Sequence, residues 1–144
     1  MLKYTIFNQR TEDMDFLFCI VVATFSGLAF IIEPLWFLLL FAPGLYFHSL
    51  INEKSAFAKG FIFGFIFYMF NSLFLSSLDI SHITDNLFMR KFIPFIAYVT
   101  VCLAEGIFSG VFARVFIYIK KRVPESSLPL VFSSLWVIYE ALLG

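Results

Sequence analysis

Charged residues are scarce in this sequence. They make up 14% of its 144 residues, against about a quarter in an average soluble domain. Ten Lys and Arg residues balance ten Asp and Glu residues, so the formal net charge is zero. Because the chain has neither a broad basic surface nor an acidic tail, we expect no nucleic-acid partner. Hydrophobic residues account for 61% of the chain, which leaves too little polar surface to cover a small soluble globule.

Motifs for catalysis and metal binding are also lacking. The sequence contains no His-Glu-x-x-His segment, no glycine-rich phosphate loop and no paired-cysteine pattern. Its two cysteines, Cys19 and Cys102, lie inside apolar stretches, where packing is the ordinary role of a free thiol. From the residues alone we therefore assign no catalytic residue, no cofactor and no metal site.

The sequence does contain five long apolar stretches, near residues 16–32, 35–50, 56–78, 92–113 and 128–144. About 20 apolar residues cross the hydrocarbon core of a bilayer. The fold class predicted is therefore an all-α integral membrane protein, a bundle of about five transmembrane helices formed by residues 16–144. Pro43 and Gly44 weaken the second stretch, so whether 35–50 spans fully is left open. Lys59, near the start of the third stretch, is expected to extend to the interface.

The first stretch has a second interpretation, a cleaved signal peptide, but its acidic flank at residues 12–15 and the lack of a small-residue cleavage site disfavour it. Cytoplasmic flanks of membrane spans carry an excess of Lys and Arg, and this excess predicts the orientation. With residues 1–15 on the cytoplasmic side, eight cations lie inside and two outside: Lys3, Arg10, Lys54, Lys59, Arg114, Lys120, Lys121 and Arg122 against Arg90 and Lys91. We expect a multi-pass protein of the cytoplasmic membrane.

Small and polar residues interrupt the apolar stretches at regular positions. Gly60 and Gly64 share one helical face, as do Gly106 and Gly110, and small residues four apart typically mark close helix packing. A gate or an oligomer seam is the alternative role of these faces. Glu105 lies in the middle of the fourth stretch, where an ionisable group is costly and normally faces the bundle interior.

Ser109 shares the helical face of Glu105, so a polar contact that orients the helix is expected there, and a proton relay is the alternative. Asn71 is a similar candidate for a hydrogen bond between helices.

Four segments in a fixed order carry a resemblance to a known family: Ser-Gly-Leu-Ala-Phe at 26–30, Glu-Pro-Leu-Trp at 33–36, the Gly-x-x-x-Gly-Phe pattern within 56–65, and Leu-Trp-Val-Ile-Tyr-Glu-Ala-Leu-Leu-Gly at 135–144. Together they resemble the N-terminal membrane domain of bacterial apolipoprotein N-acyltransferase. The family motif that closes the third span keeps only Ser77. In the last motif Trp136 and Glu140 match, whereas Ala141 and Leu143 replace the usual Trp and Arg.

The resemblance implies an enzyme of the bacterial inner membrane that transfers an acyl chain from a phospholipid to the N-terminal diacylglyceryl-cysteine of a lipoprotein, through a cysteine thioester. In that family the catalytic Glu, Lys and Cys belong to a nitrilase-like domain outside the membrane, and no residue here matches them. We therefore expect a truncated or split acyltransferase that is inactive alone. Its expected partners are membrane phospholipid and a separate chain with the remaining spans and the nitrilase-like domain, and lipoprotein is a substrate only after that complementation.

Two further alternatives stay open. Trp136 and Glu140 are candidates for shaping the entry of the acyl donor, or else for an interfacial aromatic and a carboxylate at the end of a span. The alternative function is a small multi-span membrane scaffold or transporter-like subunit that binds other spans through its glycine faces.

Overall fold

The computed structural model describes residues 2–51 and 55–143, with side chains from Met14 onward except those of Trp36 and Leu143. Lys54 and Gly144, and the side chains of Lys3 and Arg10, lie outside the described residues. The described chain forms helices and no strand, which confirms the all-α class for this part of the protein. The elements in order are α1 (Leu2–Ile31), η1 (Glu33–Leu40), α2 (Ala42–Leu50), α3 (Ala56–Asn71), η2 (Leu73–Ser77), α4 (Leu87–Lys120), η3 (Glu125–Ser127) and α5 (Leu128–Leu143).

Two of the described helices are long and apolar enough to cross a membrane. They are the segment Met14–Ile31 of α1 and the whole of α4, while α3 is apolar but shorter. Length and composition thus identify two candidate membrane spans. The helix α1 also runs without a break through the expected boundary between residues 1–15 and the first apolar stretch.

The second and third apolar stretches are not single α-helices. The second divides into η1 and α2, and Pro43 lies in the first turn of α2, where a missing backbone N–H disturbs no helical hydrogen bond. The third divides after Asn71 into α3 and η2. Each stretch is therefore traversed by two short helical segments.

The fourth helix begins earlier than the apolar stretch indicates. The side-chain oxygen of Asn86 accepts hydrogen bonds from the backbone N–H groups of Phe88, at 2.9 Å, and Met89, at 3.3 Å. This is an N-cap, which satisfies N–H groups that have no partner within the helix. Because of it, α4 starts at Leu87 and includes residues that the hydropathy pattern leaves in the preceding loop.

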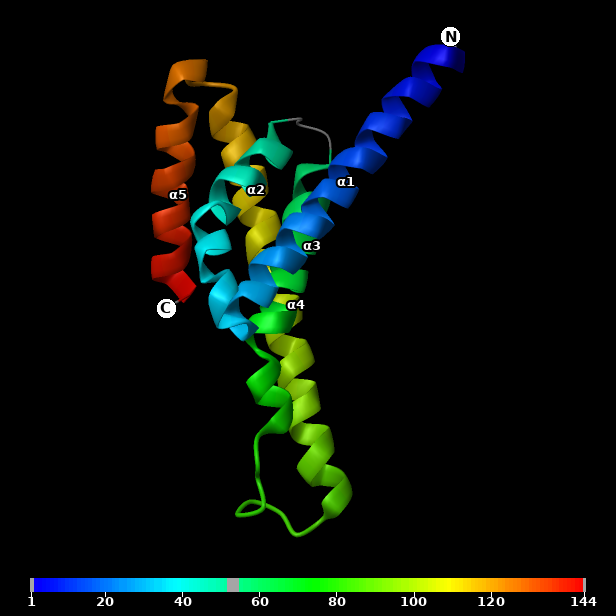
Figure 1. Cartoon of the computed structure of the whole chain (residues 1–144), viewed down its shortest axis with the longest axis vertical. Coiled ribbons are helices and arrows are strands. Elements are labelled where there is room, and N and C mark those ends of the chain that lie inside the picture. Colours follow the sequence, from blue (N-terminus) through cyan, green and yellow to red (C-terminus); the bar gives the residue numbers. More distant parts are fainter. Residues whose placement is uncertain (1, 52–54, 144) are drawn as a thin grey trace.

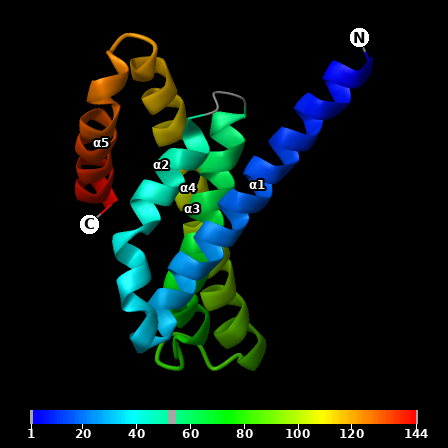
Figure 2. The ribbon, with the colours of Figure 1, turned by 45° about the horizontal axis from the view of Figure 1, so that its top comes forward.

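The helices reverse direction at each connection, and α3 lies between α1 and α4 (Figures 1 and 2). The end of α2, the start of α3, the end of α4 and the start of α5 lie at one end of the molecule (Figure 1). We call the region where α1–α5 pack together the helical core. At the opposite end, residues 73–98 project beyond the other helices as a two-armed unit closed by the 78–86 loop, and we call this unit the extension (Figure 1).

Tyr46 of α2 is at the centre of the helical core and is fully buried. Its ring stacks on Phe63 of α3 with a centroid distance of 4.0 Å, and it meets the edges of Phe132 and Trp136 of α5 at 6.1 Å. Its hydroxyl oxygen lies 3.3 Å from that of Ser109 in α4. One side chain therefore joins four helices, and each aromatic pair adds about 0.5–1.5 kcal/mol beyond the area it buries.

Candidate functional site

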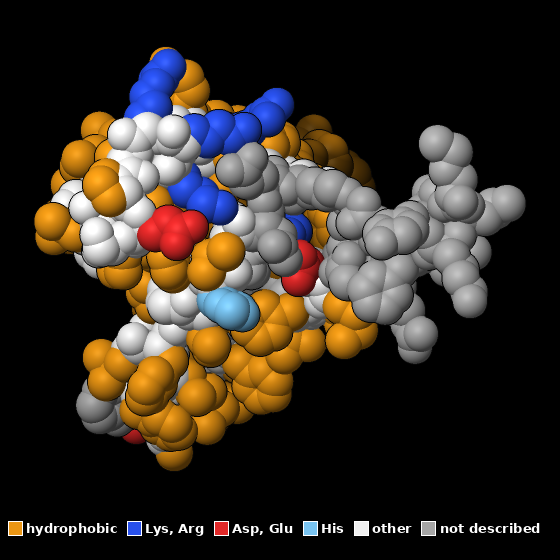
Figure 3. Space-filling model, turned by 90° about the horizontal axis from the view of Figure 1, so that it is seen from above, with side chains coloured by type: hydrophobic (Ala, Val, Ile, Leu, Met, Phe, Trp, Pro, Cys, Tyr) orange, Lys and Arg blue, Asp and Glu red, His pale blue; other side chains and the backbone are white. Residues whose placement is uncertain are grey.

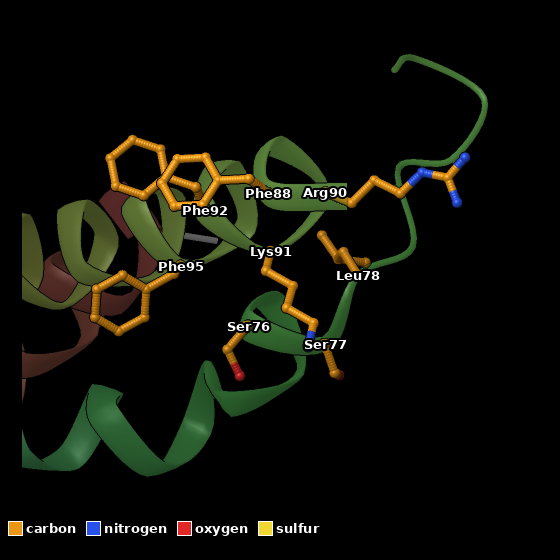
Figure 4. A pocket seen from close by; sticks show the side chains of 8 residues that line it. All are labelled: Ser76, Ser77, Leu78, Phe88, Arg90, Lys91, Phe92 and Phe95. Carbon is orange, nitrogen blue, oxygen red and sulfur yellow. The ribbon is translucent and has the colours of Figure 1, made fainter. Parts of the chain in front are cut away.

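A groove of about 660 Å³ opens on the extension, between η2 and the first turns of α4. Polar and apolar groups both line it: Ser76, Ser77, Leu78, Phe88, Arg90, Lys91, Phe92 and Phe95. The Lys91 side chain extends from α4 toward Ser77, whereas Arg90 points away toward the loop (Figure 4). The lining thus combines two cations, two hydroxyl groups and three phenyl rings, and Lys91 is the cation that points toward the hydroxyl groups.

Local hydrogen bonds position these groups. The Ser76 and Ser77 hydroxyls donate to the carbonyls of Leu73 and Phe74 at 2.7 and 2.9 Å, so their oxygens are left as acceptors. Within the described part of the chain Lys91 makes no hydrogen bond and no ion pair. Lys91 is an exposed residue, so its ammonium group is available to an anion in the groove.

Arg90 is occupied by the loop that closes the extension. Its Nε donates to the Thr84 carbonyl at 2.9 Å, and its guanidinium lies 3.5 Å from the Asp85 carboxylate. In the same loop Asp79 accepts hydrogen bonds from the Ser81 backbone N–H at 2.8 Å and from the Ser81 hydroxyl at 3.2 Å. These bonds hold the pKa of the Asp79 carboxyl below its usual range. The loop is therefore ordered by its own polar groups.

Trp136 and Glu140 lie one turn apart on α5, where the indole Nε1 donates to the Glu140 carboxylate at 2.7 Å. The Trp136 ring packs in the helical core against Phe132 and Tyr139 at centroid distances of 5.9 and 5.7 Å, while Glu140 is exposed. Ser77 belongs to η2, and η2 and α5 lie in different parts of the molecule (Figure 1). The structure therefore brings two of the three motif residues together and leaves the third in the extension groove.

The four glycines lie where α3 and α4 face each other. A Cβ atom added at Gly60 would lie 2.5 Å from the Ser109 carbonyl oxygen, and one added at Gly64 would lie 2.5 Å from the Ser109 Cβ. On the other helix, a Cβ atom at Gly110 would lie 2.8 Å from the Phe57 ring, and one at Gly106 would lie 3.0 Å from the Phe61 ring. Both glycine faces are therefore occupied within the chain.

The polar residues singled out within the apolar stretches lie apart in the structure. One carboxylate oxygen of Glu105 is buried and has no hydrogen-bond partner among the described residues, while Ser109 faces the Tyr46 hydroxyl. Asn71 is the last residue of α3 and is half-buried. The sequence predicts a polar contact on the helical face that Glu105 shares with Ser109. In the structure it is Ser109 that makes a polar contact, with Tyr46, and the sequence pattern does not single out this tyrosine.

Lys59 differs from the sequence expectation. Its side chain does not extend to the interface but is fully buried, 3.1 Å from the Asp15 carboxylate of α1 and 3.1 Å from the Ser49 carbonyl of α2. A buried ammonium is tolerated only when it is paired and hydrogen-bonded, and both partners are present here. Because Asp15 precedes Lys59 by 44 positions, no local pattern could have linked them.

Comparison with known protein families, curated proteins and solved structures finds no match to this chain. The groove, the distribution of charge and the motif residues are therefore the features that bear on function.

Proposed function

We propose that this chain is the membrane domain of a lipid acyltransferase of the apolipoprotein N-acyltransferase type, and that the extension groove binds the phospholipid acyl donor. The observation that carries the proposal is the composition of the groove, in which Lys91 extends toward Ser77 and three phenyl rings belong to the same lining (Figure 4). A phospholipid presents the complementary groups, an anionic phosphate next to apolar acyl chains. Ser77 is also the residue that the chain retains from the family motif at this position.

We propose that the chain inserts as a bundle of about five spans with the N-terminus in the cytoplasm, and the distribution of cations supports this orientation. Lys and Arg side chains gather at the end of the molecule where α4 ends and α5 begins (Figure 3), and this cluster includes Lys120, Lys121 and Arg122. Since cytoplasmic flanks carry the excess of Lys and Arg, that end belongs inside. The groove at the opposite end then opens to the outer leaflet, the side on which a nitrilase-like domain of this family would act.

The length of α4 is compatible with this arrangement, whereas α5 is shorter than a hydrocarbon core. At 1.5 Å per residue, the 34 residues of α4 extend about 50 Å, and the 16 residues of α5 about 24 Å. The longer helix exceeds a hydrocarbon core of about 30 Å, so the first turns of α4 lie at the level of the lipid headgroups. The scaffold hypothesis has less support, because the glycine faces it requires contact each other within the chain.

Photolabelling in lipid nanodiscs tests the groove. With a phosphatidylethanolamine that carries a diazirine in its acyl chain, we expect the label on peptides that contain residues 88–95. Lys91→Gln should lower that labelling about fivefold, the effect of one interfacial cation, whereas the matched variant Lys121→Gln at the other end should not. Labelling spread evenly over all exposed helices, or unchanged by Lys91→Gln, would contradict the proposal.

The acyl-transfer role needs a separate test. The chain is co-expressed with the remaining spans and the nitrilase-like domain of a bacterial apolipoprotein N-acyltransferase, in cells depleted of their own enzyme. We expect mass spectrometry to detect triacylated lipoprotein with the wild-type chain and less of it with Lys91→Gln. Absence of triacylated product in the presence of both folded chains would rule out the acyltransferase role.

A further inference from the structure

A second groove, of about 410 Å³, lies near the other end of α4. It is lined by Arg114, Val115, Ile117, Tyr118 and Lys121. Arg114, Tyr118 and Lys121 are four and three residues apart, which places them along one face of the helix. Ile117 is almost fully buried and forms the side of the groove that faces the helical core.

The charge in this groove is of one sign. Its lining contains two cations and no carboxylate. Arg114 is exposed, and it forms no hydrogen bond or ion pair with the described part of the chain. A third cation adjoins the groove, because the guanidinium carbon of Arg122 lies 3.7 Å from the centre of the Tyr118 ring. The groove therefore has the chemistry of an anion site.

The position of Arg114 along the helix indicates where the anion comes from. Arg114 precedes Lys120, the last residue of α4, by six positions, which is about 9 Å along the axis. The adjacent side chains on its outward side, Val111 and Val115, are apolar and exposed. A charged side chain on a lipid-facing surface at this depth is costly unless a counter-charge meets it, and at this depth lipid phosphates are the anions within reach.

We propose that this groove binds an anionic phospholipid of the inner leaflet. Its phosphate lies between Arg114 and Lys121, and its glycerol and first acyl carbons lie along Val115 and Tyr118. The inference rests on the membrane insertion and orientation proposed above, but not on acyl transfer. It assigns a lipid site at the opposite end of the molecule from the donor groove, with the opposite leaflet as its source.

Native mass spectrometry of the purified full chain in detergent tests this site. After addition of equal amounts of dioleoyl phosphatidylglycerol and dioleoyl phosphatidylcholine, we expect the anionic lipid to be retained at least fivefold more. Arg114→Gln should lower its retention about fivefold, while Arg114→Lys, which keeps the charge, should retain most of it. Lys120→Gln is the matched control, because it removes a nearby cation of α4 that lines neither groove.

Three outcomes would overturn the inference: equal retention of the two lipids, retention unaffected by Arg114→Gln, and an equal loss with Lys120→Gln. Glycerol phosphate distinguishes a lipid site from a site for free phosphate, since displacement of the lipid by this soluble analogue at similar concentration would contradict the lipid assignment. Because Arg114 is exposed, the variants should elute as the wild type does on size exclusion. Loss of photolabelling in the extension groove leaves this measurement unaffected, so the two proposals can fail separately.

Discussion

Phenylalanine has opposite environments in the two parts of α4. In the helical core Phe112 and Phe116 are 8% and 0% exposed, whereas in the extension Phe88 and Phe95 of the same helix are 65% and 53% exposed. Residue type and secondary structure are the same, so the difference comes from the neighbours. The core surrounds α4 with α3, α2 and α5, while the extension provides only η2 and a loop (Figure 1).

The two regions are therefore stabilised in different ways. Close helix packing, stacked rings and a buried ion pair hold the helical core together. The extension depends on the Asn86 cap, on hydrogen bonds within its loop, and on the Tyr98 hydroxyl, which donates to the Met69 carbonyl of α3 at 2.8 Å. Regions with few buried apolar contacts open at lower free energy than a packed core does. The extension should accordingly be the part that adapts to a bound lipid.

The largest expected effect tests the packing of the core. Gly64→Leu places a side chain where an added Cβ atom already lies 2.5 Å from Ser109 and 2.7 Å from the Glu105 carbonyl oxygen. We expect α3 to separate from α4 and the protein to be lost from the monodisperse peak on size exclusion. Gly44→Leu is the matched control, because nothing lies within 4 Å of its added Cβ atom. Similar recovery of the two variants would contradict close packing as the basis of the core.

The second prediction compares the ion pairs of the two regions. Asp15→Ala leaves the Lys59 ammonium buried, with the Ser49 carbonyl as its remaining hydrogen-bond partner among the described residues. We expect a loss of about 3 kcal/mol in the free energy of unfolding. Lys59→Met should cost less, because the Asp15 side chain is 28% exposed and can be hydrated. In the extension, Asp85→Asn should cause no measurable change, since Asp85 is fully exposed.

Unfolding in a detergent micelle, followed by tryptophan fluorescence, measures these three variants. The double variant Asp15→Ala/Lys59→Met should be more stable than Asp15→Ala alone, because it removes the unpaired charge. An Asp15→Ala variant as stable as Asp85→Asn would show that the buried pair contributes nothing to the difference between the regions.

The third prediction separates the two regions through a tyrosine hydroxyl in each. Tyr46→Phe removes a buried contact with Ser109 and should lower the stability of the whole protein by about 1 kcal/mol. Tyr98→Phe removes the bond to Met69 at the base of the extension and should speed amide hydrogen exchange in residues 87–98 while the core is unchanged. Exchange that rises equally in both regions of the Tyr98 variant would indicate one cooperative unit.

The sequence predicted the features that depend on local pattern. Apolar stretches located the helices. The hydrogen bond between Trp136 and Glu140 was not predicted, although a four-residue spacing brings two side chains to one face of a helix. The start of α4 could also have been predicted, because Asn is a typical N-cap and Asn86 directly precedes the helix. The start of α4 was missed because hydropathy is low over residues 79–91, and we therefore assigned these residues to a loop.

Features that depend on tertiary contacts could not be predicted. The aromatic neighbours of Tyr46 come from three other helices, and in a chain with 22 Phe residues its sequence context does not distinguish it. Lys59 was expected at an interface because a lone lysine near a helix end usually extends to water. The competing effect was its pairing with Asp15, which depends on how α1 crosses α3.

The smallest expected effect concerns the loop of the extension. The two hydrogen bonds from Ser81 lower the pKa of Asp79, so they favour the ordered loop above the pKa of a free aspartate and are lost as pH falls through the lowered pKa. Ser81→Ala removes the hydroxyl bond and keeps the stronger backbone bond, and the Asp79 pKa, measured by carboxyl-carbon NMR, should rise slightly. At low pH, amide exchange should increase in residues 79–86 but not in α3 or α5. Faster amide exchange in α3 or α5 at the same low pH would contradict this comparison. It would show that the core, like the loop, depends on the ionisation of Asp79.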